Sequence, residues 1–121
     1  MSKLEEASAI RRYITYLRNR CRLIRAKYIQ VEDNQRLFYT LLYKEIEEFG
    51  NNHLIFFSYI MGKMEFKKAK ALVGIPDRDL FRLFEKQRKL LISFIEQKEK
   101  DLFEKYPFKG TQTNCFKGVF D

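Results

Sequence analysis

Tryptophan is absent from this 121-residue sequence, and proline, cysteine, histidine and glycine are scarce, with two, two, one and five copies. Since proline and glycine interrupt regular elements, their scarcity leaves room for long helices or strands. No apolar run approaches the roughly 20 residues that span a bilayer. The longest such run, 54–61, is broken by Ser58. The sequence therefore excludes a membrane-spanning helix and predicts no membrane partner.

The residues that build catalytic or metal sites are equally sparse. His53 has no cysteine or carboxylate at ligand spacing, so no metal site is predicted. The carboxylates in 45–48 and 96–104 alternate with lysines at helical spacing, which is typical of surface ion pairs. With no phosphate-binding glycine loop either, we predict a protein that is not an enzyme and needs no cofactor. Cys21 and Cys115 lie far apart behind an N-terminus without an apolar signal core, so a reduced, cytoplasmic protein is expected.

Positive charge is abundant and unevenly distributed. The chain carries 24 Lys and Arg against 16 Asp and Glu, a formal net charge of +8. The excess falls in two blocks, 1–31 and 63–91, whereas 32–62 is acidic. Two basic blocks on a small protein are typical of a polyanion binder, although basic helices are also common as solvated surfaces.

Apolar residues recur at helical spacing through most of the chain, and no strand pattern or repeat is present. Between residues 10 and 31 the apolar residues recur at alternating spacings of three and four, which is the pattern of a heptad seam. The seam consists of Ile10, Ile14, Leu17, Cys21, Ile24, Tyr28 and Val31. It predicts either a homodimer through this seam or packing inside the monomer. The other faces of this helix are basic, and we expect partner or secondary nucleic-acid contacts at Arg11, Arg18, Arg22 and Arg25.

The polar cluster 32–35 predicts a helix break, with Asp33 or Asn34 capping a second helix over 37–49. Gly50 is expected to end that helix in the left-handed conformation. Asn51 or Asn52 should then cap a third helix over 54–61, which Gly62 ends. A short helix over 64–73 closes at Gly74, and Pro76 with Asp77 opens a long last helix that stops before Pro107.

These elements predict an all-α helical bundle, with a long basic N-terminal helix and a C-terminal helix-turn-helix. We divide the chain into a basic helical region (1–49), a helix-turn-helix module (50–106) and a tail (107–121), together forming one compact domain. Phe108, Phe116, Val119 and Phe120 are the apolar residues of the tail and are expected to dock on the bundle.

The segment 73–91 has the features of a DNA-reading helix-turn-helix. Gly74 tolerates a left-handed backbone, Ile75 fills the elbow, and Pro76 with Asp77 starts the next helix. At roughly 100° per residue, four cations of the helix over 77–92 share one sector of roughly 80°. They are Arg78, Arg82, Lys86 and Lys89. The opposite sector is expected to pack in the core through Leu80, Leu83, Phe84, Leu90 and Leu91.

These residues resemble region four of bacterial sigma factors and the small ArpU-type phage regulators of late transcription. The matching positions are Val73, Gly74 and Ile75 at the turn, Leu80 as the buried aliphatic, and the closing run Lys86-Gln87-Arg88 with Leu91. Pro76 stands where the family usually has serine, and Lys70 where it usually has a small alanine. The resemblance covers about a third of the chain.

The resemblance implies a sequence-specific, duplex-DNA-binding transcription regulator of phage or mobile-element type, with RNA polymerase as a further partner. The implied base contacts are Arg78, Arg82, Lys86 and Lys89, and the implied backbone contacts are Lys67, Lys68 and Lys70. If six to eight phosphates are neutralised, log affinity falls with log salt at a slope of roughly −5 to −7.

Two alternatives stay open at this stage. One is a non-catalytic helical interaction protein, such as a phage inhibitor of a host protein or an RNA binder, that acts through its arginine-rich first helix. The other is a phage assembly or packaging protein, since helix-turn-helix modules occur there too.

Overall fold

The computed structural model describes residues 3–109, and all regular structure in that range is helical, which confirms the all-α prediction. The helices are α1 (Lys3–Arg25), α2 (Asp33–Asn52), α3 (Leu54–Ile60), α4 (Phe66–Val73) and α5 (Asp77–Lys105). None of the helices in this range combines the length and apolar character that crossing a membrane requires.

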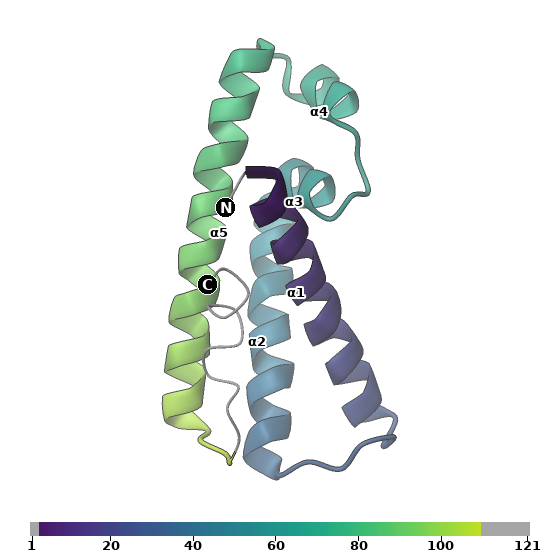
Figure 1. Cartoon of the computed structure of the whole chain (residues 1–121), viewed down its shortest axis with the longest axis vertical. Helices are drawn as coiled ribbons and strands as arrows, with labels where there is room; N and C mark the ends of the chain where they lie inside the picture. Colours follow the sequence, from purple (N-terminus) through teal and green to yellow (C-terminus); the bar gives the residue numbers. More distant parts are fainter. Residues whose placement is uncertain (1–2, 110–121) are drawn as a thin grey trace.

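Three long helices form the body of the molecule. The central helix, α2, packs against both α1 and α5 (Figure 1). The two short helices lie together at the upper end of the view, where α4 contacts α3 and the beginning of α5 (Figure 1). The longest helix, α5, therefore belongs to the bundle along most of its length and meets α4 only near its N-terminus.

The core is built from one face of each long helix. Fully or almost fully buried side chains include Ile10, Ile14 and Leu17 of α1, Phe38, Leu42 and Ile46 of α2, and Leu80, Leu91 and Ile95 of α5. Each such burial favours folding by roughly 1.5–3 kcal/mol. The first half of the heptad seam thus packs inside the monomer, as one of its two interpretations requires. A homodimer through the seam stays a prediction.

The first helix ends earlier than the seam predicts. Lys27 adopts a left-handed backbone with φ of 61°, and Tyr28 donates its N–H to the carbonyl of Leu23 at 3.0 Å. With the second bond, from Lys27 N–H to the carbonyl of Ile24 at 3.1 Å, this is a Schellman ending. Tyr28 and Val31 therefore lie outside α1, and the predicted break at 32–35 is corrected to the residues between Arg25 and Asp33. A lysine holds the position that glycine usually occupies, so the sequence carries no visible signal for this ending.

Gly50 does not end α2, which corrects the prediction for this residue. The helix continues to Asn52, and Gly50 is buried within it without a positive φ. Its missing side chain instead permits close packing, since a Cβ there would lie 2.7 Å from the Phe57 ring of α3. Neither Asn51 nor Asn52 caps α3, because His53 takes the capping position without a side-chain bond. Gly62 does follow the end of α3, as predicted, and has a left-handed backbone with φ of 76°.

The start of α2 also differs from the prediction. Glu32 is the N-cap residue and makes no side-chain capping bond, so neither Asp33 nor Asn34 caps this helix. Asn34 instead donates from Nδ2 to the carbonyl of Pro107 at 2.7 Å, which ties the end of the α5 segment to α2. Phe108 is buried against the Phe38 ring, with ring centroids 5.2 Å apart, as expected for docking of the tail. The other apolar tail residues, Phe116, Val119 and Phe120, lie outside the described residues.

Two side chains of α5 are placed differently from the prediction. Leu90 is 49% exposed and is not part of the core. Glu99 is buried and accepts a hydrogen bond from the Tyr13 hydroxyl of α1 at 2.7 Å, so it is not a surface ion-pair residue. Lys98 does form an ion pair, but it lies 3.5 Å from Glu45 of α2 and its partner is therefore not a carboxylate at helical spacing on α5.

Candidate nucleic-acid interface

A short turn of three residues joins α4 to α5. Gly74 is left-handed with φ of 75° and donates its N–H to the carbonyl of Lys70 at 2.8 Å, which closes α4. Pro76, with φ of −59°, then accepts the N–H groups of Asp79 and Leu80 at its carbonyl oxygen. The residues expected at the bend therefore have the backbone conformations that were predicted for them.

An ion pair spans this turn. Lys70 of α4 lies 2.7 Å from the carboxylate of Asp77, the first residue of α5. The N-cap residue of α5 is Pro76, which makes no side-chain capping bond, and the Asp77 carboxylate instead contacts Lys70. Both side chains are about half exposed, and such a surface pair contributes little stability by itself. The pair partly neutralises the charge of Lys70, whereas Lys67 and Lys68 are exposed on α4.

The packing at the elbow places a small side chain next to Lys70. Ala69, one position earlier, is completely buried and supplies the small residue next to the turn. Ile75 is partly buried against the core and fills the bend. The short helix is therefore held by Ala69, Val73 and Ile75, and its lysines are left for the outer surface.

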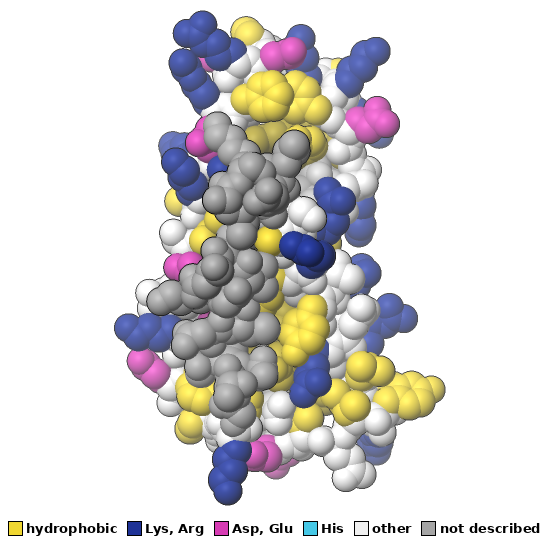
Figure 2. All heavy atoms as spheres, in the orientation of Figure 1, with side chains coloured by type: hydrophobic (Ala, Val, Ile, Leu, Met, Phe, Trp, Pro, Cys, Tyr) yellow, Lys and Arg dark blue, Asp and Glu magenta, His cyan; other side chains and the backbone are white. Residues whose placement is uncertain are grey.

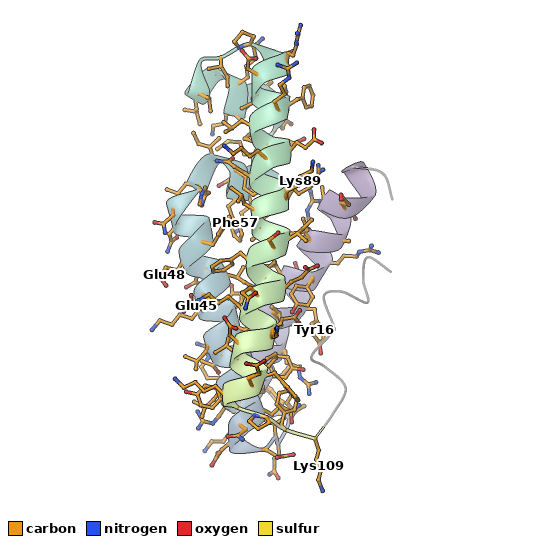
Figure 3. All side chains as sticks on the ribbon, turned by 90° about the vertical axis from the view of Figure 1, so that its left-hand side faces the viewer. Tyr16, Glu45, Glu48, Phe57, Lys89 and Lys109 are labelled. Carbon is orange, nitrogen blue, oxygen red and sulfur yellow. The ribbon has the colours of Figure 1, made fainter. Side chains whose placement is uncertain are left out.

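The four cations predicted to share a face of α5 are exposed together. Arg78, Arg82, Lys86 and Lys89 all lie at the surface, and we call these residues the α5 strip. The opposite side of the same segment is buried through Leu80, Phe84 and Leu91. Lys89 marks the lower end of the strip, at the height where α1 begins (Figure 3).

Two carboxylates of α5, Asp79 and Glu85, flank the strip. Glu85 lies 3.7 Å from the Lys89 ammonium, one helical turn away. The Lys89 side chain is 72% exposed, so solvent screens the pair strongly. The strip therefore keeps a positive surface, with its charge reduced near Lys89.

Exposed apolar side chains accompany these charges, and sequence reasoning missed them. The Phe81 ring stacks on the Phe66 ring of α4 with centroids 4.3 Å apart, yet 57% of Phe81 is exposed. Leu72 of α4 is exposed to the same extent. Figure 2 shows hydrophobic side chains at the surface of the upper end of the molecule, with Lys and Arg side chains on both sides of them. On a helical projection at roughly 100° per residue, Phe81 falls between the predicted apolar sector and the cationic sector, which is the signal that could have identified it.

Arg88, part of the closing run, is not a surface residue. It is buried and lies 3.6 Å from Glu6 of α1, so it anchors the start of α1 to α5. Gln87 keeps a buried side-chain oxygen without a hydrogen-bond partner among the described residues.

The four arginines predicted as secondary contacts on α1 differ in their surroundings. Arg11 donates from Nε to the carbonyl of Ile60 at 3.0 Å, and its guanidinium lies against Gly62, so it holds α3 in place. Arg18 is partly buried, whereas Arg22 and Arg25 are exposed near the end of the helix.

The histidine and the described cysteine have structural surroundings. His53 stacks on Phe49, and its Nδ1 lies 2.9 Å from the Phe49 carbonyl, which can only accept a hydrogen bond. The Cys21 thiol donates to the carbonyl of Tyr39 at 3.3 Å, and burial raises its pKa, with the Arg25 charge opposing. Over residues 3–109, no three metal-ligating side chains come together.

Comparisons with models of known protein families, with curated proteins and with solved structures found no match for this chain.

Proposed function

We propose that this protein is a sequence-specific, duplex-DNA-binding regulator of transcription, of phage or mobile-element type, acting in the cytoplasm. The observation that carries the proposal is the α5 strip. Four cations stand exposed on one face of a helix that begins at a sharp turn and is anchored from behind by Leu80, Phe84 and Leu91. A recognition helix needs this combination of a fixed back and a polar, donor-rich front.

The dimensions of the strip suit the major groove. Arg78 and Lys89 are eleven residues apart, which is roughly 16 Å along a helix axis. The major groove is roughly 12 Å wide and admits an α-helix. Arginine can donate two parallel hydrogen bonds to a guanine edge, so Arg78 and Arg82 are the proposed base-reading residues.

The short helix supplies the contacts that position the protein. Lys67 and Lys68 project from α4, which adjoins the start of α5, and they would pair with phosphates beside the groove. Lys70 adds to this contact only in part, because Asp77 already shares its charge. Lys86 and Lys89, as point charges, contribute to the phosphates or to guanine edges further along α5.

Selection of bound duplexes from a random pool, followed by titration of one variant, tests base reading. Arg82→Ala should lose on the order of 1–3 kcal/mol of discrimination between the selected and a random duplex. The matched control is Arg12→Ala, which removes an exposed arginine of α1 and should leave the discrimination unchanged. An equal loss of affinity for both duplexes in Arg82→Ala would contradict base reading at that residue.

A second candidate function is supported at the opposite end of the molecule. Tyr28 is 80% exposed and Leu23 41% exposed, beside the exposed Arg22 and Arg25. Tyrosine and arginine are enriched at the centres of protein interfaces, so this end favours contact with a partner protein such as RNA polymerase or a host protein. If Tyr28→Ala abolishes the biological effect while binding to selected DNA is intact, the interaction function is the principal one.

A further inference from the structure

A cavity of about 250 Å³ opens where α1, α2 and α3 meet. Apolar side chains from all three helices line it, namely Ile14, Ile46 and Phe57. Polar and charged side chains complete the lining, among them Asn51, Ser58 and Lys63. A cavity of roughly 150 Å³ is large enough to hold benzene. This one therefore has room for a larger apolar group.

A basic hollow of about 410 Å³ adjoins this cavity between α1 and α2. Four cations line it: Arg18, Arg22, Arg25 and Lys44. The one acidic residue in its lining is Glu47. Arg18, Tyr43 and Glu47 line both spaces, so the apolar cavity and the basic hollow meet at these side chains.

Arg18 stands at this junction with an unsatisfied donor. Its Nε atom is buried and has no hydrogen-bond partner among the described residues. A buried donor without a partner is costly, and an anionic oxygen is the partner that a guanidinium binds best. Cys21, which also lines the hollow, has a pKa raised by burial and so adds no negative charge near neutral pH.

We propose that the joined site binds a small organic anion, with its apolar body in the cavity and its phosphate or carboxylate group in the basic hollow. Arg18 would contact the anion at the junction, while Arg22, Arg25 and Lys44 would surround it from the open side. The charge of the hollow selects an anion, and the apolar cavity selects one that carries a ring or a short chain rather than a free inorganic ion. The site is separate from the α5 strip and does not depend on DNA binding.

Calorimetric titration of the full chain with three probes tests the proposal. One molecule of naphthyl phosphate should bind per chain. Its affinity should be at least tenfold higher than that of inorganic phosphate, which lacks the apolar body, and that of naphthol, which lacks the charge. Naphthoate in place of naphthyl phosphate distinguishes a carboxylate site from a phosphate site. Equal affinity for naphthyl phosphate and inorganic phosphate would overturn the role of the cavity.

Two variants assign the binding to these residues. Arg18→Met keeps the apolar stem and removes the charge, so it should weaken naphthyl phosphate at least tenfold, whereas Arg12→Met, outside both spaces, should not. Ser58→Leu fills the cavity and should weaken naphthyl phosphate while leaving the affinity for inorganic phosphate unchanged. The proposal is overturned if Arg18→Met and Arg12→Met lose equal affinity for naphthyl phosphate, or if Ser58→Leu binds naphthyl phosphate as the unaltered chain does. Either result holds whatever the outcome of the DNA-binding experiments.

Discussion

The contact between Gly50 and Phe57 makes a prediction that runs against ordinary helix chemistry. Alanine in the middle of a helix is normally more favourable than glycine by roughly 0.8–1.0 kcal/mol. In this chain an added Cβ at Gly50 would lie 2.7, 2.8 and 2.9 Å from three atoms of the Phe57 ring (labelled in Figure 3). Relief of such an overlap needs movement of the ring or of α3.

Overpacking of this kind typically costs about 1–3 kcal/mol. After the helical gain of about 1 kcal/mol is subtracted, Gly50→Ala should destabilise the protein by up to about 2 kcal/mol. In a Phe57→Ala background the overlap is gone, so the same change should stabilise it by about 1 kcal/mol. The interaction energy between the two sites is then about 1–3 kcal/mol.

Urea unfolding followed by far-ultraviolet circular dichroism, on the four proteins of this double-mutant cycle, measures that energy. The reversal of sign between the two backgrounds is the expected result. If Gly50→Ala stabilises the protein equally with and without the Phe57 ring, the packing of α3 on α2 is not as described.

Three further predictions concern the core and the helix ends. Lys27→Gly should raise the free energy of unfolding by about 1 kcal/mol, because glycine tolerates the left-handed backbone there. The control Lys44→Gly, inside α2, should lower it by a similar amount. Equal effects of the two changes in urea unfolding would refute the Schellman ending. Tyr13→Phe removes the 2.7 Å hydrogen bond to buried Glu99 and should lower the free energy of unfolding by about 1–3 kcal/mol in the same assay. An unchanged urea midpoint would contradict a stabilising role of this hydrogen bond. Burial raises the pKa of Cys21 above its usual 9.0, so the folded state keeps the thiol proton to higher pH and stability falls as pH rises through that range. Cys21→Ala should reduce this loss of stability in unfolding measured from pH 8 to 10. Identical pH profiles for the two proteins would refute the role of Cys21.

Much of the fold follows from local patterns in the sequence. The apolar period predicts helices close to all five observed ones, and the scarce glycines and prolines predict the bend at Gly74 and Pro76. These signals succeed because they act over a few residues. The exposure of the α5 strip follows from the same periodicity, since a strongly cationic face seldom packs in a core.

The differences arise where distant parts of the chain meet. Gly50 looks like a helix end, but it is a contact point for Phe57. Arg11 looks like surface charge, but it binds the carbonyl of Ile60, 49 residues away. Glu99 finds its partner Tyr13 at a separation of 86 residues. Helical spacing cannot reveal such contacts.

The salt dependence of DNA binding tests the central claim most directly. Of the seven proposed contacts, Lys70 and Lys89 already lie beside carboxylates, so five to seven phosphates should be neutralised. Titration of the full chain with selected duplex DNA at several salt concentrations should then give a slope of log affinity against log salt of roughly −4 to −6. The slope should become shallower by about one when Lys86 is replaced by alanine and should not change in Lys100→Ala, an exposed lysine further along α5. A slope near zero, or equal slopes in both variants, would contradict recognition of DNA by the α5 strip.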